Sequence, residues 1–162
     1  MQPTPLRLQW LDMVLQAYYA AYGGRMPVDV WSIHNQILQE DRNDWGCGIP
    51  PGIAVDQGML YSVYDNANIE IFRQHVLDFR IWMRARGERE KPLIISEYGV
   101  LMPSEYLGGG DAQYGDEVVK KFMTDSFDYL LSATDAALGC PADGYRLVQR
   151  WAWLVQSERQ DH

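Results

Sequence analysis

The stretch from Lys91 to Val100 constrains the fold of this chain more than any other part of its sequence. Its middle, Leu93-Ile94-Ile95, is a continuous apolar run, and Glu97 follows two residues later. A run without polar alternation is typical of a parallel strand that is buried on both faces. A carboxylate is costly at the end of such a strand unless another group pairs with it or uses it. The sequence therefore predicts a parallel strand that presents Glu97 as a structural cap, as an ion-pair partner or as a functional acid.

Predicted helices and strands alternate along the chain. Apolar spacing predicts helices over residues 6–22, 69–86 and about 116–138, and apolar runs predict strands over residues 28–33, 93–95 and 146–155. Long segments follow the strands and short turns follow the helices, which is typical of (β/α) barrels with function in their βα loops. Three strands cannot close an eight-stranded barrel. We therefore expect an α/β fold, a partial (β/α)8 TIM barrel, in a single domain spanning residues 1–162.

Polar or aromatic side chains stand at the end of each predicted strand. They are His34 and Asn35 on the first strand, Glu97 and Tyr98 on the second, and Trp151 and Trp153 on the third. Taken singly, they are explained by a structural histidine, a turn-forming asparagine and core tryptophans. In a parallel barrel, however, the carboxyl ends of the strands converge on one site. Their joint occurrence at three consecutive strand ends therefore favours a functional site.

The chain resembles the retaining glycoside hydrolases of clan A, which are (β/α)8 barrels. More narrowly, it is similar to the bacterial relatives of the cellulase-like and alkali-sensitive-linkage-type glycosyl hydrolases. The matching segments are Asp29-Val-Trp-Ser-Ile-His34, Pro92-Leu-Ile-Ile-Ser-Glu-Tyr-Gly99 and Gln149-Arg-Trp-Ala-Trp153, as the sixth, seventh and eighth strands. The resemblance spans nearly the whole chain, and its Ser-Glu-Tyr-Gly segment is the most specific part. It implies that the chain is the C-terminal part of such a barrel.

The resemblance also implies roles for individual residues. Glu97 would be the catalytic nucleophile, and Trp153 or Trp151 would form the platform under the sugar. His34 would contact the substrate. Apart from the resemblance, the strand-end positions of Asn35 and Tyr98 make them further candidates for the substrate-binding site, and Trp31 on the first strand is a third.

One part of the family pattern is missing from the chain. Retaining hydrolysis needs a second carboxyl group about 5 Å from the nucleophile. The family supplies it from an Asn-Glu pair on the fourth strand, and no Asn-Glu dipeptide occurs here. The loop acids that offer an alternative are Glu40, Asp41, Asp44 and Glu105. Solvated loop carboxylates are the simpler expectation for all four, so the acid/base residue is expected to be absent.

Composition narrows the range of partners. A net charge of -8 argues against nucleic acid. No apolar run approaches the ~18 residues of a membrane span. Six Trp and ten Tyr suit a sugar-binding cleft as well as a core. Neither a metal-ligand spacing nor a cofactor motif occurs, so no metal and no cofactor is expected. The first residues, Met1-Gln-Pro-Thr-Pro, do not resemble a secretory signal, although relatives of this kind are often exported.

Three interpretations remain open from the sequence alone. The first is the C-terminal fragment of a glycoside hydrolase that acts on β-linked oligo- or polysaccharide when the missing half of the barrel is supplied. The second is a non-catalytic carbohydrate-binding module in which Glu97 is a hydrogen-bonding acid. The third is a structural half-barrel that self-associates, because exposed strand edges invite pairing.

Overall fold

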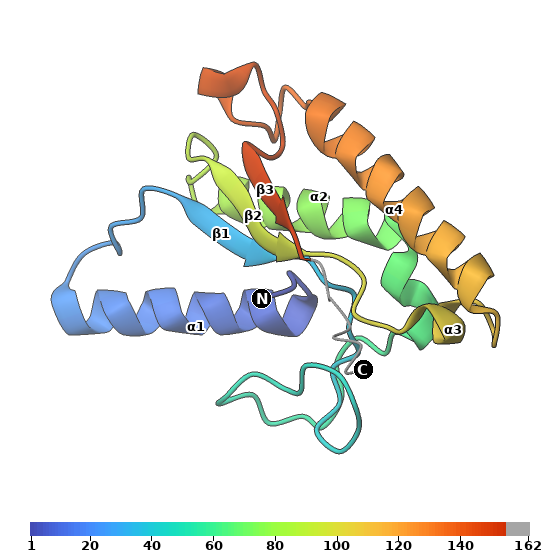
Figure 1. The fold of residues 1–162 in the computed structure, drawn as a ribbon. Helices are drawn as coiled ribbons and strands as arrows, with labels where there is room; N and C mark the ends of the chain where they lie inside the picture. Colours follow the sequence, from blue (N-terminus) through green and yellow to red (C-terminus); the bar gives the residue numbers. More distant parts are fainter. Residues whose placement is uncertain (155–162) are drawn as a thin grey trace, which may run out of the picture.

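The computed structural model describes residues 1–154 as an α/β fold in which helices alternate with parallel strands (Figure 1). The elements in chain order are α1 (Pro5–Tyr22), β1 (Trp31–His34), η1 (Val63–Ala67), α2 (Ile69–Ala85), β2 (Leu93–Tyr98), α3 (Ser104–Leu107), α4 (Ala112–Ser132), η2 (Pro141–Asp143) and β3 (Arg150–Trp153). The predicted alternation of elements is confirmed. Val155, predicted as the end of the third strand, lies outside the described residues.

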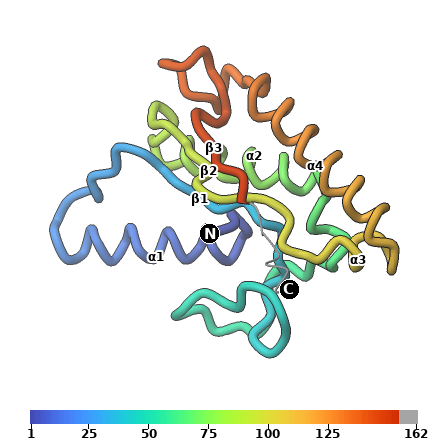
Figure 2. Tube along the Cα trace, in the orientation of Figure 1, coloured from blue at the N-terminus to red at the C-terminus, as the bar shows by residue number. Residues whose placement is uncertain are grey.

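The three strands form one open, wholly parallel sheet in the order β1-β2-β3. The predicted α/β class with parallel strands is confirmed, but the predicted partial TIM barrel is wrong, because the strands of residues 1–154 make a small open sheet. Neighbouring strands twist by only about 20–25° relative to one another. Closing a barrel needs a tilt and stagger that accumulate over about eight strands. The trace in Figure 2 shows the resulting short, twisted ribbon.

The core lies between the sheet and the helices that pack on it. The strand residues Ile33, Leu93 and Ile95 are fully buried, and they meet Phe72 and Phe79 of α2 in the same apolar cluster. In Figure 1, α2 runs behind the sheet, α4 lies along the β3 side and α1 along the β1 side. The expected helical stripe of α2 is therefore the face that covers the sheet.

Several element boundaries differ from the sequence prediction; β1 begins at Trp31 and not at residue 28, and α4 ends at Ser132 and not at residue 138. The helix expected from about residue 116 begins at Ala112, because the Asp111 carboxylate caps it by accepting a hydrogen bond from the Tyr114 amide at 3.1 Å. The third strand begins at Arg150 and not at residue 146. Arg146 instead makes antiparallel bridges to Thr134 and Cys140, in the compact turn after α4.

A buried arginine organises the amino-terminal end of the sheet. Arg80 of α2 has no exposed surface, and its guanidinium donates to the carbonyl oxygens of Leu147 at 2.6 Å and Lys91 at 3.1 Å. It also donates to Gln149 Oε1 at 2.7 Å, and the same oxygen accepts from the Leu93 amide. Burial lowers the pKa of Arg80 to about 10. These contacts tie α2 to the starts of β2 and β3, so this end of the sheet has a structural role.

Candidate functional site

Glu97 lies at the carboxyl end of the central strand. The pairing of β1 with β2 is regular as far as Ile33 and Ile95, and the register then shifts so that His34 lies opposite Glu97. Ser96 is the extra residue of this bulge, and its hydroxyl lies 2.8 Å from the hydroxyl of Ser32. Bulges re-aim the side chain that follows them. The Glu97 side chain is 37% exposed as a result and is open to a ligand.

Two side chains from β1 and the segment after it meet the Glu97 carboxylate. Gln36 Nε2 donates a hydrogen bond to Oε1 of Glu97, and His34 Nδ1 lies 3.8 Å from the same oxygen. Within residues 1–154, no hydrogen bond to Oε2 of Glu97 accompanies these contacts. Burial lowers the pKa of His34, and so does the nearby positive charge of the Met1 amino group, whereas the opposing effect of the Glu97 charge is smaller, so the imidazole is neutral near pH 7.

A buried hydrogen-bonded chain holds the backbone between His34 and Gln36. Asn35 is 1% exposed; its backbone amide donates to the Glu97 carbonyl oxygen at 3.0 Å and its Nδ2 to the Phe72 carbonyl oxygen at 3.1 Å. Its Oδ1 therefore accepts from Nδ1 of His75 at 2.8 Å. Nε2 of His75 then accepts from the Tyr61 hydroxyl at 2.9 Å. This arrangement fixes one neutral tautomer of His75. Burial lowers the pKa of the His75 imidazole to about 4.

The loop after β1 is held by a second buried cluster around Glu40. The Glu40 carboxylate has no exposed surface and accepts from the Thr4 hydroxyl at 2.6 Å and the Met59 amide at 3.1 Å. Arg7 Nε of α1 lies 2.9 Å from Oε1 of Glu40. The carboxylate is therefore fully used in joining α1 to the loop. The structure gives Glu40 a structural role, and its carboxylate has no surface open to a substrate.

The other loop acids considered as the missing acid also have local partners or lie elsewhere. Asp41 accepts from Gln57 Nε2 at 2.6 Å and from the Asn43 amide at 2.8 Å, and these bonds lower its pKa. Asp44 accepts from Gln39 Nε2 at 3.0 Å. Glu105 lies on α3 and is exposed. The contacts of Glu97 within the described residues thus come from an amide and an imidazole, and neither is a carboxyl group.

The structure places three of the predicted substrate-binding residues inside the protein. Trp31 is 7% exposed and packs edge-on against Phe79 and Trp82. Tyr98 is fully buried, and its hydroxyl lies 3.3 Å from that of Ser126. Asn35 belongs to the buried chain described above. Their side chains are occupied by protein contacts, so none of the three is free to contact a substrate.

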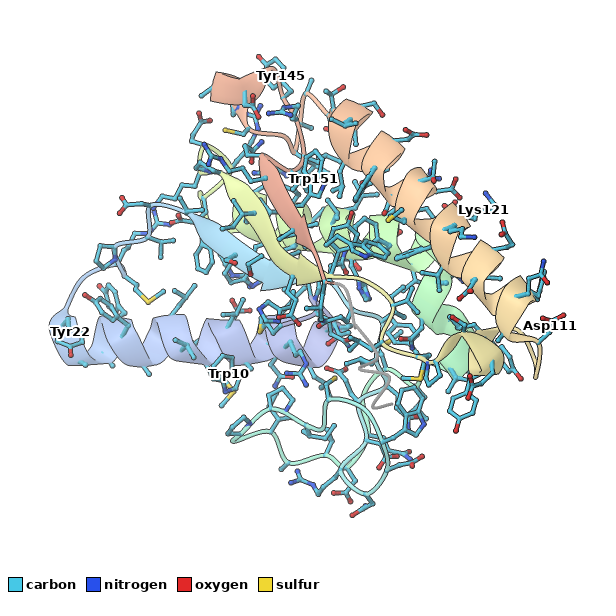
Figure 3. The ribbon with its side chains drawn as sticks, viewed as in Figure 1. Trp10, Tyr22, Asp111, Lys121, Tyr145 and Trp151 are labelled. Atoms are coloured by element: carbon cyan, nitrogen blue, oxygen red, sulfur yellow. The ribbon has the colours of Figure 1, made fainter. Side chains whose placement is uncertain are left out.

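The two tryptophans of β3 are half-buried on the helix-facing side of the sheet. Trp153 packs edge-on against Tyr98 with ring centroids 5.2 Å apart, and it also meets Phe122 and Phe127 of α4. Trp151 pairs in register with the buried Ile95 and is labelled in Figure 3. Trp153 also lines a hollow beside α3. It therefore keeps an accessible part, and a platform role for Trp153 stays a prediction.

In residues 1–154 no group of three or more His, Cys, Asp or Glu is placed to hold a metal ion, and Cys47 and Cys140 are free thiols. None of the helices in this part of the chain is long and apolar enough to cross a membrane. No protein-family model, curated protein or solved structure matches the chain. The resemblance to glycoside hydrolases therefore stays a prediction.

Sequence reasoning missed Gln36, His75 and Tyr61, although one of them carried a detectable signal. His75 lies three residues after Phe72 and one before Val76, on the apolar face that buries α2 against the sheet. A polar residue on such a face needs a buried partner. That partner, Asn35, could have been sought at a strand end. Gln36 gave no comparable signal, because it lies in an irregular polar segment.

Proposed function

We propose that this chain acts on β-linked carbohydrate as the nucleophile-bearing part of a retaining glycoside hydrolase, with Glu97 as the nucleophile. The observation that supports this most strongly is the partly exposed Glu97 carboxylate at the end of the central strand. Gln36 holds Oε1 and leaves Oε2 without a donor from the described residues. An oriented carboxylate with one free oxygen is suited to attack a carbon atom above the sheet edge.

The proposed reaction has two steps. Oε2 of Glu97 attacks the anomeric carbon of the sugar, the bond from that carbon to the glycosidic oxygen breaks, and the leaving oxygen takes the electron pair. Water then attacks the anomeric carbon of the glycosyl ester, the bond from that carbon to Oε2 breaks, and Glu97 regains its carboxylate while the water gives one proton to the solvent and the sugar is released. His34 is neutral and lies beside the carboxylate, so it can hydrogen-bond a sugar hydroxyl without neutralising the nucleophile. Asn35 and His75 act through the backbone, as positioning residues for Gln36.

The first step normally needs a proton for the leaving oxygen. No carboxyl group is among the contacts that the described residues, 1–154, make with Glu97. The proton donor is therefore expected outside these contacts. A good leaving group such as 2,4-dinitrophenolate departs from the sugar without a proton. We therefore expect this chain to cleave dinitrophenyl β-glycosides, and not alkyl β-glycosides.

The test is the release of dinitrophenolate from a panel of dinitrophenyl β-glycosides. We expect release above the buffer rate for the unaltered protein and loss of that release in Glu97→Gln, because an amide is a poor nucleophile. Glu90→Gln is the matched control, since its exposed side chain precedes β2 at the other end of the strand. Equal rates in Glu97→Gln and the unaltered protein would remove Glu97 from the mechanism.

A second function is favoured by one observation. The absence of a carboxyl partner among the described contacts of Glu97 suits a non-catalytic carbohydrate-binding site, in which the Glu97 carboxylate accepts hydrogen bonds from sugar hydroxyls. In that case Glu97→Gln would weaken sugar binding, and no variant of the chain would release dinitrophenolate.

A further inference from the structure

Two hollows flank the short helix α3, in the part of the chain that follows β2. Figure 2 shows the trace leaving the end of β2 and running into α3. The first, here called the Trp153 hollow, has a volume of about 520 Å³ and is lined by residues 100–105 together with Asp116, Val119 and Trp153. The second, the Tyr106 hollow, has a volume of about 500 Å³ and is lined by Tyr64, Tyr106 and the glycine-rich turn after α3. Glu105 lines both, so the hollows meet at this residue.

Aromatic side chains stand along both hollows. Tyr64 of η1 is 64% exposed and Tyr106 of α3 is 58% exposed, while Trp153 borders the first hollow. A tyrosine ring combines an apolar face with a polar edge. A sugar ring has the same character, with C–H groups on its faces and hydroxyl groups at its rim. Exposed rings of this kind can stack on the sugar rings of an oligosaccharide.

The charge of the hollows has a single sign. Glu105 and Asp116 contribute carboxylates, and neither hollow is lined by a lysine or arginine of the described residues. Asp116 accepts a hydrogen bond from the Ser104 hydroxyl at 2.5 Å. The Glu105 carboxylate, by contrast, enters no ion pair with the described part of the chain. With a net charge of -8 for the whole chain, the hollows repel anionic ligands and favour cationic ones.

We propose that the Trp153 hollow and the Tyr106 hollow form one groove that binds an oligosaccharide of unacetylated amino sugars. Tyr64 and Tyr106 stack on the sugar rings, and Glu105 pairs with a sugar ammonium group. The choice of a carbohydrate rests on the function proposed above, because the Trp153 hollow begins three residues after Glu97 in the sequence. The charge of the lining selects the amino sugar.

The test is calorimetric titration of three tetrasaccharides, at pH 6 and low salt, built of glucosamine, N-acetylglucosamine or galacturonic acid. We expect the glucosamine tetramer to bind about 2- to 5-fold more tightly than its acetylated form, the range that one exposed ion pair provides. Glu105→Gln should abolish this preference. Tyr106→Ala should weaken both sugars about tenfold. Tyr22→Ala, a tyrosine that is 72% exposed at the far end of α1 (Figure 3), should change neither.

Several results would overturn the proposal. They are absence of binding by all three sugars, binding of the galacturonic acid tetramer as tight as that of glucosamine, a preference that survives Glu105→Gln, and an equal effect of Tyr22→Ala and Tyr106→Ala. Dinitrophenolate release, measured on the unaltered protein beside the titration, separates this proposal from the one on catalysis. Binding of the glucosamine tetramer without any release would support the groove and refute the nucleophile. Release that depends on Glu97, without binding of the tetramer, would refute the groove and support the nucleophile.

Discussion

Replacing the buried His75 by glutamine should remove much of the loss of stability at acidic pH. His75 is 3% exposed, and burial lowers its pKa to about 4, from 6.5 in an unfolded chain. Between these two pH values the unfolded chain binds a proton that the folded protein does not bind. Stability therefore falls as the pH is lowered through this window, by about 3 kcal/mol when the loss is complete and by about 2 kcal/mol at pH 5.

The assay is equilibrium unfolding in urea at pH 8 and pH 5, for the unaltered protein and for His75→Gln. A glutamine side chain can donate to Asn35 and accept from Tyr61, as His75 does, but it does not titrate. We expect the unaltered protein to lose about 2 kcal/mol more than the variant between the two pH values. The same loss in both proteins would show that His75 is not held neutral by burial and would refute the reasoning.

Three further predictions concern stability and are checked by thermal and urea unfolding. Glu40→Ala should cost roughly 3–5 kcal/mol, because it leaves the Arg7 cation without its buried partner, whereas Glu117→Ala, in an exposed ion pair, should change little. Asn35→Leu should cost roughly 2–6 kcal/mol, because two buried polar groups lose their partners. Gly115→Ala should cost roughly 1–3 kcal/mol, because its Cβ would lie 1.7 Å from the Ser104 carbonyl oxygen and force α3 away from α4. If a variant were as stable as the unaltered protein, the corresponding contact would not stabilise the fold as described.

The parallel sheet could be predicted from the sequence because its signal is local. The apolar run Leu93-Ile94-Ile95 forms the central strand and pairs with β1 at one edge and β3 at the other. The prediction that both faces of this strand are buried is wrong, because Leu93 and Ile95 face the core whereas Ile94 is only half-buried on the opposite face. The barrel prediction failed because closure depends on how many strands are present and how they are staggered, which the local pattern of three strands does not encode. Single boundaries failed for a similar reason, as the bridges from Arg146 to Thr134 and Cys140 are decided by tertiary contact.

The candidate site was predictable in part. The parallel arrangement brings His34 and Glu97 to the same end of the sheet, as the sequence predicts, but the bulge at Ser96 sets them opposite each other. The role of Asn35 as a link to His75, and the contact of Gln36 with Glu97, depend on a bulge and on a loop anchored by Glu40. Sequence pattern gives residue types and spacing, but not which of two adjacent side chains faces the core. This is why Trp31 and Tyr98 were expected at the site and lie in the core.

The most direct measurement of the central claim is the trapping of a glycosyl ester on Glu97. The protein is incubated with dinitrophenyl 2-deoxy-2-fluoro β-glycosides, whose leaving group departs without a proton and whose fluorine slows the second step. Intact mass and peptide mapping then locate the adduct. We predict a single sugar on the peptide that contains Glu97, and none in Glu97→Gln. A folded protein that takes up no sugar, or takes it up on another residue, would contradict the assignment of Glu97 as the nucleophile.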